Sequence, residues 1–262
     1  MRSDRFVCRK FKERILNIKI IGVIPARYQS SRMPGKPISD ILGKPMIWWV
    51  YQQVMKNKDL ADVVVATDDD RIAGECKKYG MKYVMTSVNH DTPTSRLYEV
   101  SEKIKADLYM LIMGDEPLVD ERSFSLVMPD NYEGGYYVGA LTNVLTNPTE
   151  VIDFSNQKVV TNSKRETLLI SRSPIPYPKG TLDFQYEKVT GVQIFSKEAL
   201  DFYNKTSKSI LEKAEENDLM RFVENGISVK MTVSNYKTIS VDTPKDLEKV
   251  REIIGAKKRN EI

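Results

Sequence analysis

The sequence has little of what several common classes of protein need. Among its 262 residues are only two cysteines, Cys8 and Cys76, and a single histidine, His90. The cysteines stand far apart without cysteine or histidine neighbours, which argues against a disulfide framework and against a zinc site. A lone histidine is weak support for acid–base catalysis, and the chain has neither a GxSxG motif nor a paired cysteine and histidine for nucleophilic catalysis.

Long apolar runs are missing too. No stretch approaches the roughly 20 apolar residues of a membrane span, and residues 1–19 lack the apolar core of a secretory signal. We therefore expect no membrane segment and a cytoplasmic location.

Charge is unevenly distributed along the chain. Residues 1–19 hold seven Lys or Arg and two Asp or Glu, whereas the remaining 243 residues hold 33 basic and 34 acidic side chains. A basic extension on a nearly neutral body, without a face that interleaves aromatic and basic side chains, does not indicate nucleic-acid binding. We expect residues 1–18 to be an extension outside the domain, with a partner-binding or membrane-surface helix as the alternative.

From Lys19 onward, short apolar runs alternate with helical stretches, which is typical of βαβ units. The sequence therefore predicts an α/β fold, with a mostly parallel sheet, helices on both faces and one domain over residues 19–256. The expected strands are 20–24, 62–67, 82–86, 108–113, 136–144, 159–171, 189–195 and 237–241. The expected helices begin at Pro45, cover 71–79, 94–104, 197–204 and 209–225, and end with one that Thr243 caps. An insertion at about 150–190, with the proline-rich run SPIPYPKG, is expected to carry an oligomer contact.

The run IPARYQSSRMPGKP, residues 24–37, directly follows the first expected strand. Arg27, Arg32 and Lys36 place three cations within ten residues, and glycine and proline fix the turns, so a triphosphate is the natural partner. The chain lacks the GxGxxG of a dinucleotide site and the Ser or Thr that a Walker loop needs after GK. A solvated basic loop is the alternative interpretation.

Two carboxylates, Asp115 and Asp242, follow expected strands at their carboxyl ends. Ligands of open parallel sheets bind at that edge. Two carboxylates facing a basic loop repel each other unless a hard cation lies between them, which predicts Mg²⁺. Capping a helix or turn is the alternative role for each.

Two further positions are candidates. Asp68 to Asp70 end another buried strand and are compatible with the DxD metal motif of a nucleotide-sugar glycosyltransferase, although we favour helix capping for Asp69 and Asp70. Arg96 stands in the first turns of a helix, where it could meet the carboxylate of a second substrate or form an exposed helical salt bridge.

The chain resembles the 3-deoxy-manno-octulosonate cytidylyltransferases, the CMP-Kdo synthetases, over about residues 19–252. The resemblance is carried by several motifs in order: IPARYQSSRMPGKP, GKPMI, VVVATDD, HDTPTSR, GDEP, SRSPIPY and VDTPKDLEKVR. It implies a Rossmann-like nucleotide-diphospho-sugar transferase fold and a homodimer. It also implies transfer of CMP from CTP to the hydroxyl of a sugar acid with release of pyrophosphate, in lipopolysaccharide or capsule biosynthesis.

Carried over by position, the resemblance also assigns roles to residues. Lys36, Asp115 and Asp242 would be catalytic, and the two aspartates would hold Mg²⁺. The nucleotide would be bound by Pro25, Ala26, Arg27, Arg32, Lys36, Thr67 and Asp68. The acceptor would be bound by Arg96, Met113, Val189, Glu212, Glu215 and Leu219.

Departures from the family pattern gather on the acceptor side. The family's QGDEP is MGDEP here, with Met113 for glutamine, and its HxGIY is VTGVQ, with Val189 for histidine and Gln193 for tyrosine. The glutamine of its ExxExLEQLR helix is Leu219. Losing polar partners would leave hydroxyl groups of ordinary Kdo unpaired, so we expect a changed acceptor acid. A cytidylyltransferase for another small acid, a nucleotide-sugar glycosyltransferase and a non-catalytic nucleotide-binding protein are the alternatives.

Overall fold

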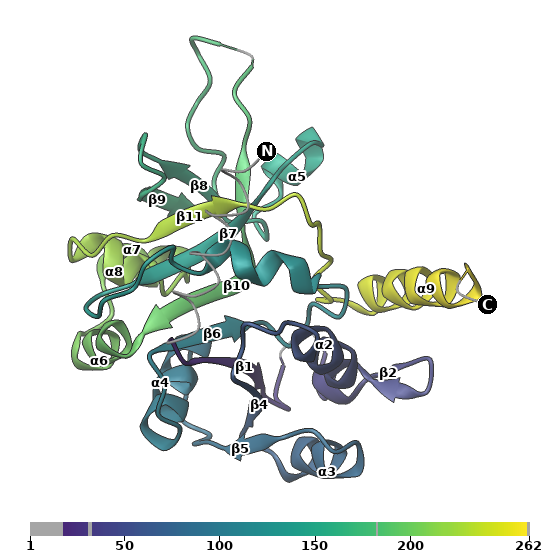
Figure 1. Ribbon diagram of the computed structural model, residues 1–262. Helices are drawn as coiled ribbons and strands as arrows, with labels where there is room; N and C mark the ends of the chain where they lie inside the picture. The colour runs from purple at the N-terminus through teal and green to yellow at the C-terminus, as the bar shows by residue number, and fades with distance from the viewer. Residues whose placement is uncertain (1–17, 31–32, 182, 261–262) are drawn as a thin grey trace, which may run out of the picture.

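A nine-stranded mixed sheet lies at the centre of the structure, a computed structural model that describes residues 18–30, 33–181 and 183–260 (Figure 1). The expected N-terminal extension, apart from Ile18, and Arg32 lie outside these residues. The strands are β1 (Ile20–Ala26), β4 (Asp62–Thr67), β5 (Tyr83–Met85), β6 (Leu108–Ile112), β7 (Val138–Val144), β8 (Lys158–Thr161), β9 (Thr167–Ser171), β10 (Glu187–Ser196) and β11 (Lys230–Val233), with β2 (Asp40–Ile41) and β3 (Lys44–Pro45) as a separate hairpin.

Helices cover the sheet and connect its strands. They are α2 (Met46–Met55), α3 (Asp70–Lys78), α4 (Pro93–Lys103), α5 (Pro148–Ile152), α6 (Lys197–Lys205), α7 (Ile210–Glu215), α8 (Met220–Glu224) and α9 (Pro244–Asn260), with 3₁₀ turns η1 (Lys36–Ile38) and η2 (Glu121–Val127). Within the part of the chain described, no helix is both long and apolar enough to cross a bilayer.

The strand order is β11-β7-β10-β6-β1-β4-β5, with β8 and β9 attached to β10. Strand β1 is parallel to both of its neighbours, β4 and β6, so the carboxyl ends of these three strands meet at one edge. We call this the carboxyl edge. Strand β10 runs antiparallel to β6 and β7. The predicted α/β fold, with parallel strands around β1 and helices on both faces, is confirmed.

Alternate side chains of each central strand are buried on opposite faces of the sheet. In β1, Ile20 and Ile24 enter the cluster that also contains α2 and α3 residues, whereas Ile21 and Val23 enter the cluster with residues of α4, α6 and α8. Because successive strand side chains point to opposite faces, such continuously apolar strands need cover on both sides.

Helix α9 brings the end of the chain back to its first part. Asp246 N donates to Thr243 Oγ1 over 3.3 Å, so Thr243 caps α9 and Pro244 is its first residue, as predicted. Val250 of α9 packs in a third buried cluster with Ile41 of β2. The start of α9 is therefore held against the β2–β3 hairpin.

The structure contradicts the predicted strand at 237–241. These residues lie outside the sheet, and the final strand is β11, which the sequence analysis did not predict. Val241 is buried in the third cluster, and Ile239 packs against it. Their alternation therefore comes from packing against α9 rather than from strand pairing.

Two other predicted elements are each divided in two. Segment 159–171 forms the hairpin β8–β9, closed by the bond from Asn162 N to Glu166 O of 2.9 Å. Segment 209–225 forms α7 and α8, separated at Glu216, whose φ of 49° is left-handed. Polar residues at both breaks favour the turns.

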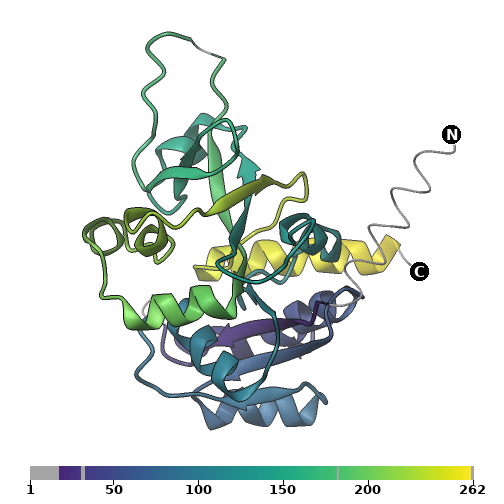
Figure 2. The ribbon, with the colours of Figure 1, turned by 60° about the vertical axis from the view of Figure 1, so that its left-hand side comes forward.

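A projecting lobe, formed by α5, β8, β9 and the long connection from β9 to β10, extends beyond the central strands of the sheet (Figures 1 and 2). It corresponds to the insertion expected at about 150–190. The main sheet, its helices and α9 form the rest of the molecule.

A buried ion pair joins α7 to α8. Arg221 Nε and Nη2 donate to the two carboxylate oxygens of Glu212 over 2.7 and 2.5 Å, and the two side chains are 7% and 4% exposed. Arg221 Nη1 also donates to the backbone oxygens of Tyr203 and Thr206. With so many partners satisfied, the pair holds the end of α6 and both short helices together.

We predict that Glu212→Ala lowers the free energy of unfolding by about 3–5 kcal/mol, because the buried guanidinium loses its counter-charge. Urea unfolding of the whole chain measures this. The matched control is Glu248→Ala, which removes the partner of Arg251 in a pair whose glutamate is 65% exposed and should cost about 1 kcal/mol or less. Equal, small losses in both variants would show that the junction does not depend on the Arg221 pair.

Candidate active site at the carboxyl edge

Three predicted catalytic side chains meet at the carboxyl edge. Lys36 Nζ lies 2.6 Å from Asp115 Oδ2 and 3.4 Å from Asp242 Oδ1. The three side chains are 14%, 16% and 31% exposed. Residues separated by 79 and 206 positions in the sequence are thus brought to one ammonium group.

The loop after β6 places Asp115. Met113 N donates to Gly191 O over 2.8 Å, and Asp115 O accepts from Val241 N over 2.9 Å. A Cβ atom at position 114 would lie 2.8 Å from Pro25 O, so Gly114 permits the loop to pass directly against the end of β1. The backbone therefore ties Asp115 to β1, to β10 and to the segment that carries Asp242.

Asp242 is held by the start of α9. Its backbone N donates to Asp246 Oδ2 over 3.2 Å, and Thr243 N donates to the same oxygen over 2.8 Å. The cap of α9 therefore fixes the backbone on which the Asp242 carboxylate stands.

In this structure the ammonium of Lys36 contacts both carboxylates, and partial burial strengthens these attractions. The Mg²⁺ expected between Asp115 and Asp242 stays a prediction.

The donors also fit Mg²⁺, because carboxylate oxygens are hard ligands and Mg²⁺ in nucleotide sites takes one or two carboxylates together with phosphate oxygens. In the described part of the chain, no group of three or more His, Cys, Asp or Glu residues could hold a metal. Substrate oxygens and water would have to complete the coordination around Asp115 and Asp242.

The basic loop begins at the end of β1. Pro25 and Ala26 are the last residues of the strand, and because Ala26 is buried, only its backbone is available to a ligand. Arg27 follows and is exposed. Arg32 cannot be placed because it lies outside the described residues.

Two contacts that hold this loop in place were not predicted from the sequence. Gly35 N donates to Tyr28 O over 2.8 Å, which joins the two ends of the loop. The guanidinium of Arg71 stacks 3.2 Å from the centre of the Tyr28 ring and forms an ion pair with Asp69. The signal that could have indicated it is an aromatic residue inside a run of cations.

Thr67 and Asp68 end β4 beside the loop, and Asp68 is paired with Arg96. Arg96 Nη2 lies 2.7 Å from Asp68 Oδ2, with the two side chains 4% and 13% exposed. The alternative of an exposed helical salt bridge for Arg96 is therefore wrong. A predicted nucleotide residue and a predicted acceptor residue thus contact each other.

The neighbouring aspartates lie at the start of α3. Asp69 caps the helix by accepting from Arg71 N, as the sequence favoured, whereas Asp70 is an exposed residue of the first turn and not the cap.

The remaining predicted acceptor residues occupy two environments. Met113 lies beside the irregular stretch of β10 between Val189 and Gln193, where the register with β7 shifts. Val189 packs against the face that contains α4, α6 and α8, and Leu219 is fully buried in that face. Leu219 therefore offers no surface to an open pocket.

Glu212 and Glu215 make internal contacts. Both oxygens of Glu212 are bound to Arg221. Glu215 accepts from Ser171 Oγ and Arg172 N over 2.6 and 2.8 Å, linking α7 to the end of β9. In this structure both carboxylates face protein partners, and their assignment to the acceptor stays a prediction.

Glu116, next to Asp115, was not singled out from the sequence. It is 6% exposed, and its Oε1 accepts from Gly191 N over 3.0 Å. Burial, and then the charge of Asp115, raises the pKa of Glu116 to about 7. A buried glutamate thus stands next to Asp115 and feels its charge.

Comparison with known proteins agrees with this geometry. A family model described as cytidylyltransferase matches residues 21–239. The 3-deoxy-manno-octulosonate cytidylyltransferase of Escherichia coli is 37% identical over 238 residues, which are 90% of this chain and 96% of that protein. The protein of the same name from Fusobacterium nucleatum is 37% identical over 235 residues, 89% of this chain and 96% of that one.

Solved structures give the same result. A CMP:2-keto-3-deoxy-manno-octonic acid synthetase complexed with CTP matches with a TM-score of 0.85 and 37% identity, over 91% of this chain and 99% of that chain. The inositol-1-phosphate CTP transferase of T. maritima is similar in fold, with a TM-score of 0.66 and 16% identity over 91% of this chain and 96% of that chain. The Rossmann-like nucleotidyltransferase fold is thus confirmed, and the chain belongs to the 3-deoxy-manno-octulosonate cytidylyltransferase family of cytidylyltransferase enzymes.

Proposed function

We propose that this protein transfers CMP from CTP to the hydroxyl group of a sugar acid related to Kdo, with release of pyrophosphate. The observation that carries the proposal is the single ammonium of Lys36 in contact with both Asp115 and Asp242. This cluster stands at the carboxyl edge, next to the basic loop that follows β1. A cytoplasmic location and a role in lipopolysaccharide or capsule biosynthesis would follow from the acceptor.

The residues of the carboxyl edge would bind and orient the triphosphate. The exposed Arg27 and the Lys36 ammonium would face phosphate oxygens, and the acceptor hydroxyl would attack the α-phosphorus in line with the departing pyrophosphate. The new O–P bond forms, the bond to pyrophosphate breaks and the hydroxyl proton is released. Asp115 and Asp242 would hold Mg²⁺, which when bound supplies positive charge beside the phosphates.

Arg96 would recognise the acceptor's carboxylate. In the structure its guanidinium is bound to Asp68. We infer that an acidic acceptor would compete with Asp68 for this guanidinium, so that the ion pair would hold the arginine ready in its place.

We predict that Lys36→Met, Asp115→Asn and Asp242→Asn each lower kcat for pyrophosphate release by about 100-fold or more, because Lys36 would contact the phosphates and the two aspartates would hold the Mg²⁺ beside them. The assay follows pyrophosphate formed from CTP, Mg²⁺ and a panel of sugar acids. Asp70→Asn is the matched control, since this aspartate is exposed in the first turn of α3. Loss of activity in the Asp70 variant with a fully active Lys36 variant would instead favour a glycosyltransferase.

The acceptor pocket would differ from that of enzymes specific for ordinary Kdo. Met113 and Val189 stand where the family pattern has glutamine and histidine; Met113 lies beside Gly191 of β10, and Val189 belongs to the same strand. Each lost hydrogen-bonding partner would weaken binding of a sugar hydroxyl by about 1–3 kcal/mol.

We predict that the wild-type protein uses another sugar acid better than Kdo, and that Met113→Gln raises kcat/KM for Kdo by about tenfold through a restored hydrogen bond. Initial rates with both acids measure this. Met55→Gln, at an exposed position of α2, is the matched control and should leave the ratio unchanged. Wild-type kcat/KM for Kdo as high as for any other acid in the panel would reject the changed acceptor.

We also propose that the protein is a homodimer joined through the projecting lobe. Large apolar side chains of this lobe are exposed, with Ile152 and Phe154 at 73% and Tyr177 at 86%. Solvent-exposed apolar groups gathered on one projecting part are typical of an interface. The resemblance stated above independently implies a dimer.

Phe154→Asp should raise the dimer dissociation constant by about tenfold or more, because it places a charge in an apolar contact. Sedimentation velocity over a range of concentrations gives this constant. Val88→Asp is the control, since Val88 is 72% exposed but lies outside the lobe. A wild-type monomer at all concentrations, or an equal shift in both variants, would contradict an interface in the lobe.

A further inference from the structure

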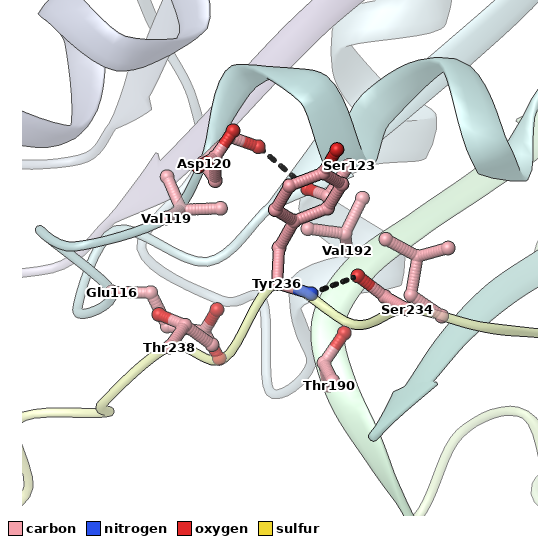
Figure 3. A pocket seen from close by; sticks show the side chains of 10 residues that line it. Glu116, Val119, Asp120, Ser123, Thr190, Val192, Ser234, Tyr236 and Thr238 are labelled. Atoms are coloured by element: carbon pink, nitrogen blue, oxygen red, sulfur yellow. Dashed lines mark hydrogen bonds between the residues drawn. The ribbon is translucent and has the colours of Figure 1, made fainter. Parts of the chain in front are cut away.

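A small cavity is lined by Glu116, the residue that follows Asp115 in the sequence (Figure 3). The space open to a water molecule within it is about 10 Å³. Residues of the loop after β6, of η2, of strands β7 and β10, and of the chain between β11 and α9 line it. The loop after β6 and the chain between β11 and α9 also carry Asp115 and Asp242.

Three polar oxygen atoms that line the cavity are buried and without a hydrogen bond in the described part of the chain. They are Glu116 Oε2, Thr190 Oγ1 and Thr238 Oγ1. Thr238 lies next to the Glu116 carboxyl group (Figure 3), and this hydroxyl group lowers the pKa of Glu116 against the larger effect of burial. The hydroxyl and the carboxyl oxygen nevertheless do not have the geometry of a direct hydrogen bond. A buried oxygen atom without a partner destabilises the folded protein, so one such atom from each of three segments indicates a shared ligand.

The other carboxylate oxygen of Glu116 is in close contact with strand β10. Glu116 Oε1 accepts from Gly191 N over 3.0 Å. A Cβ atom at position 191 would lie 2.6 Å from this oxygen, so only glycine lets strand β10 approach the carboxylate so closely. Glu116 is thereby fixed with Oε2 left for the cavity.

We propose that this cavity binds one structural water molecule that joins Glu116, Thr190 and Thr238 and thereby positions Asp115 and Asp242. A water molecule has two protons to donate and two lone pairs to accept with, so it can donate to the carboxylate and to one hydroxyl and accept from the other. The cavity is about the size of one water molecule, for which roughly 10–15 Å³ is the lower limit. A sodium or potassium ion would need more oxygen ligands than these three.

The position of the cavity explains why it would matter for catalysis. Glu116 is adjacent to Asp115, and Thr238 stands four residues before Asp242. The two segments are otherwise linked by the bond of 2.9 Å from Val241 N to Asp115 O. A water molecule between Glu116 and Thr238 adds a second link, and Thr190 ties both to β10. The water molecule would thereby help to fix the separation of the two aspartates, on which their joint binding of Mg²⁺ would depend.

The first test is a crystal structure of the whole chain at high resolution, which does not require activity. It should show a density peak at about 2.7–3.2 Å from all three oxygens. A crystal soaked in a thallium(I) salt separates water from a monovalent cation, and anomalous density in the cavity would overturn the proposal. The absence of any peak there would overturn it as well.

The second test rests on the proposed transfer reaction and uses Thr238→Val, with Thr238→Ser as the variant that keeps the hydroxyl group. We expect the valine variant to lose the density peak, to have a kcat about tenfold lower and to need several-fold more Mg²⁺ for half-maximal rate, with KM for CTP unchanged. The serine variant should behave like the wild type. A valine variant that is merely less stable to heat, with unchanged kcat and Mg²⁺ dependence, would reduce the water to a structural role and overturn the positioning.

An inactive wild-type protein would contradict the proposed function but leave the crystallographic result on the water intact. A wild-type protein that is active, but whose crystal structure shows no peak in the cavity, would support the proposed function and overturn the proposed water. The two proposals can therefore fail separately.

Discussion

The contact of one ammonium with two carboxylates is the constraint on which the arrangement of the site depends. Lys36, Asp115 and Asp242 come from a loop, a turn after β6 and the start of α9. Each requires its own support: the tied ends of the basic loop, the passage of Gly114 against β1, and the packing of α9 on the β2–β3 hairpin. Since two carboxylates repel each other, the Lys36 ammonium and these supports together keep both aspartates at one place.

The sheet could be predicted from the sequence because its central strands are buried on both faces. Continuous apolar runs such as 20–24 and 108–113 have no other common explanation at that length, and their order with helices indicates parallel pairing. The same rule failed at 237–241, where alternating apolar residues pack on α9. The local pattern of apolar residues indicates that a side chain is buried, but it does not indicate which element covers it.

The site was predictable where chemistry and local position coincide. Asp115 and Asp242 follow apolar runs, and Lys36 belongs to a dense group of cations, so each is visible within a few residues of sequence. Glu116 and Arg71 could not be found in this way. The importance of Glu116 comes from Gly191, 75 residues away, and that of Arg71 from the ring of Tyr28. Only the folded chain shows these partners.

In the proposed function, activation of CTP and choice of the acceptor would depend on different side chains. The cluster consists of the charged side chains of Lys36, Asp115 and Asp242, so replacing any of the three by a neutral residue removes a charge from it. Met113 and Val189 instead project from a loop and an irregular strand whose backbone bonds do not involve their side chains. Exchanging such side chains alters which hydroxyl groups find partners, but it leaves the positions of Lys36 and the aspartates unchanged. Selection of the acid and activation of CTP are therefore separable in this fold.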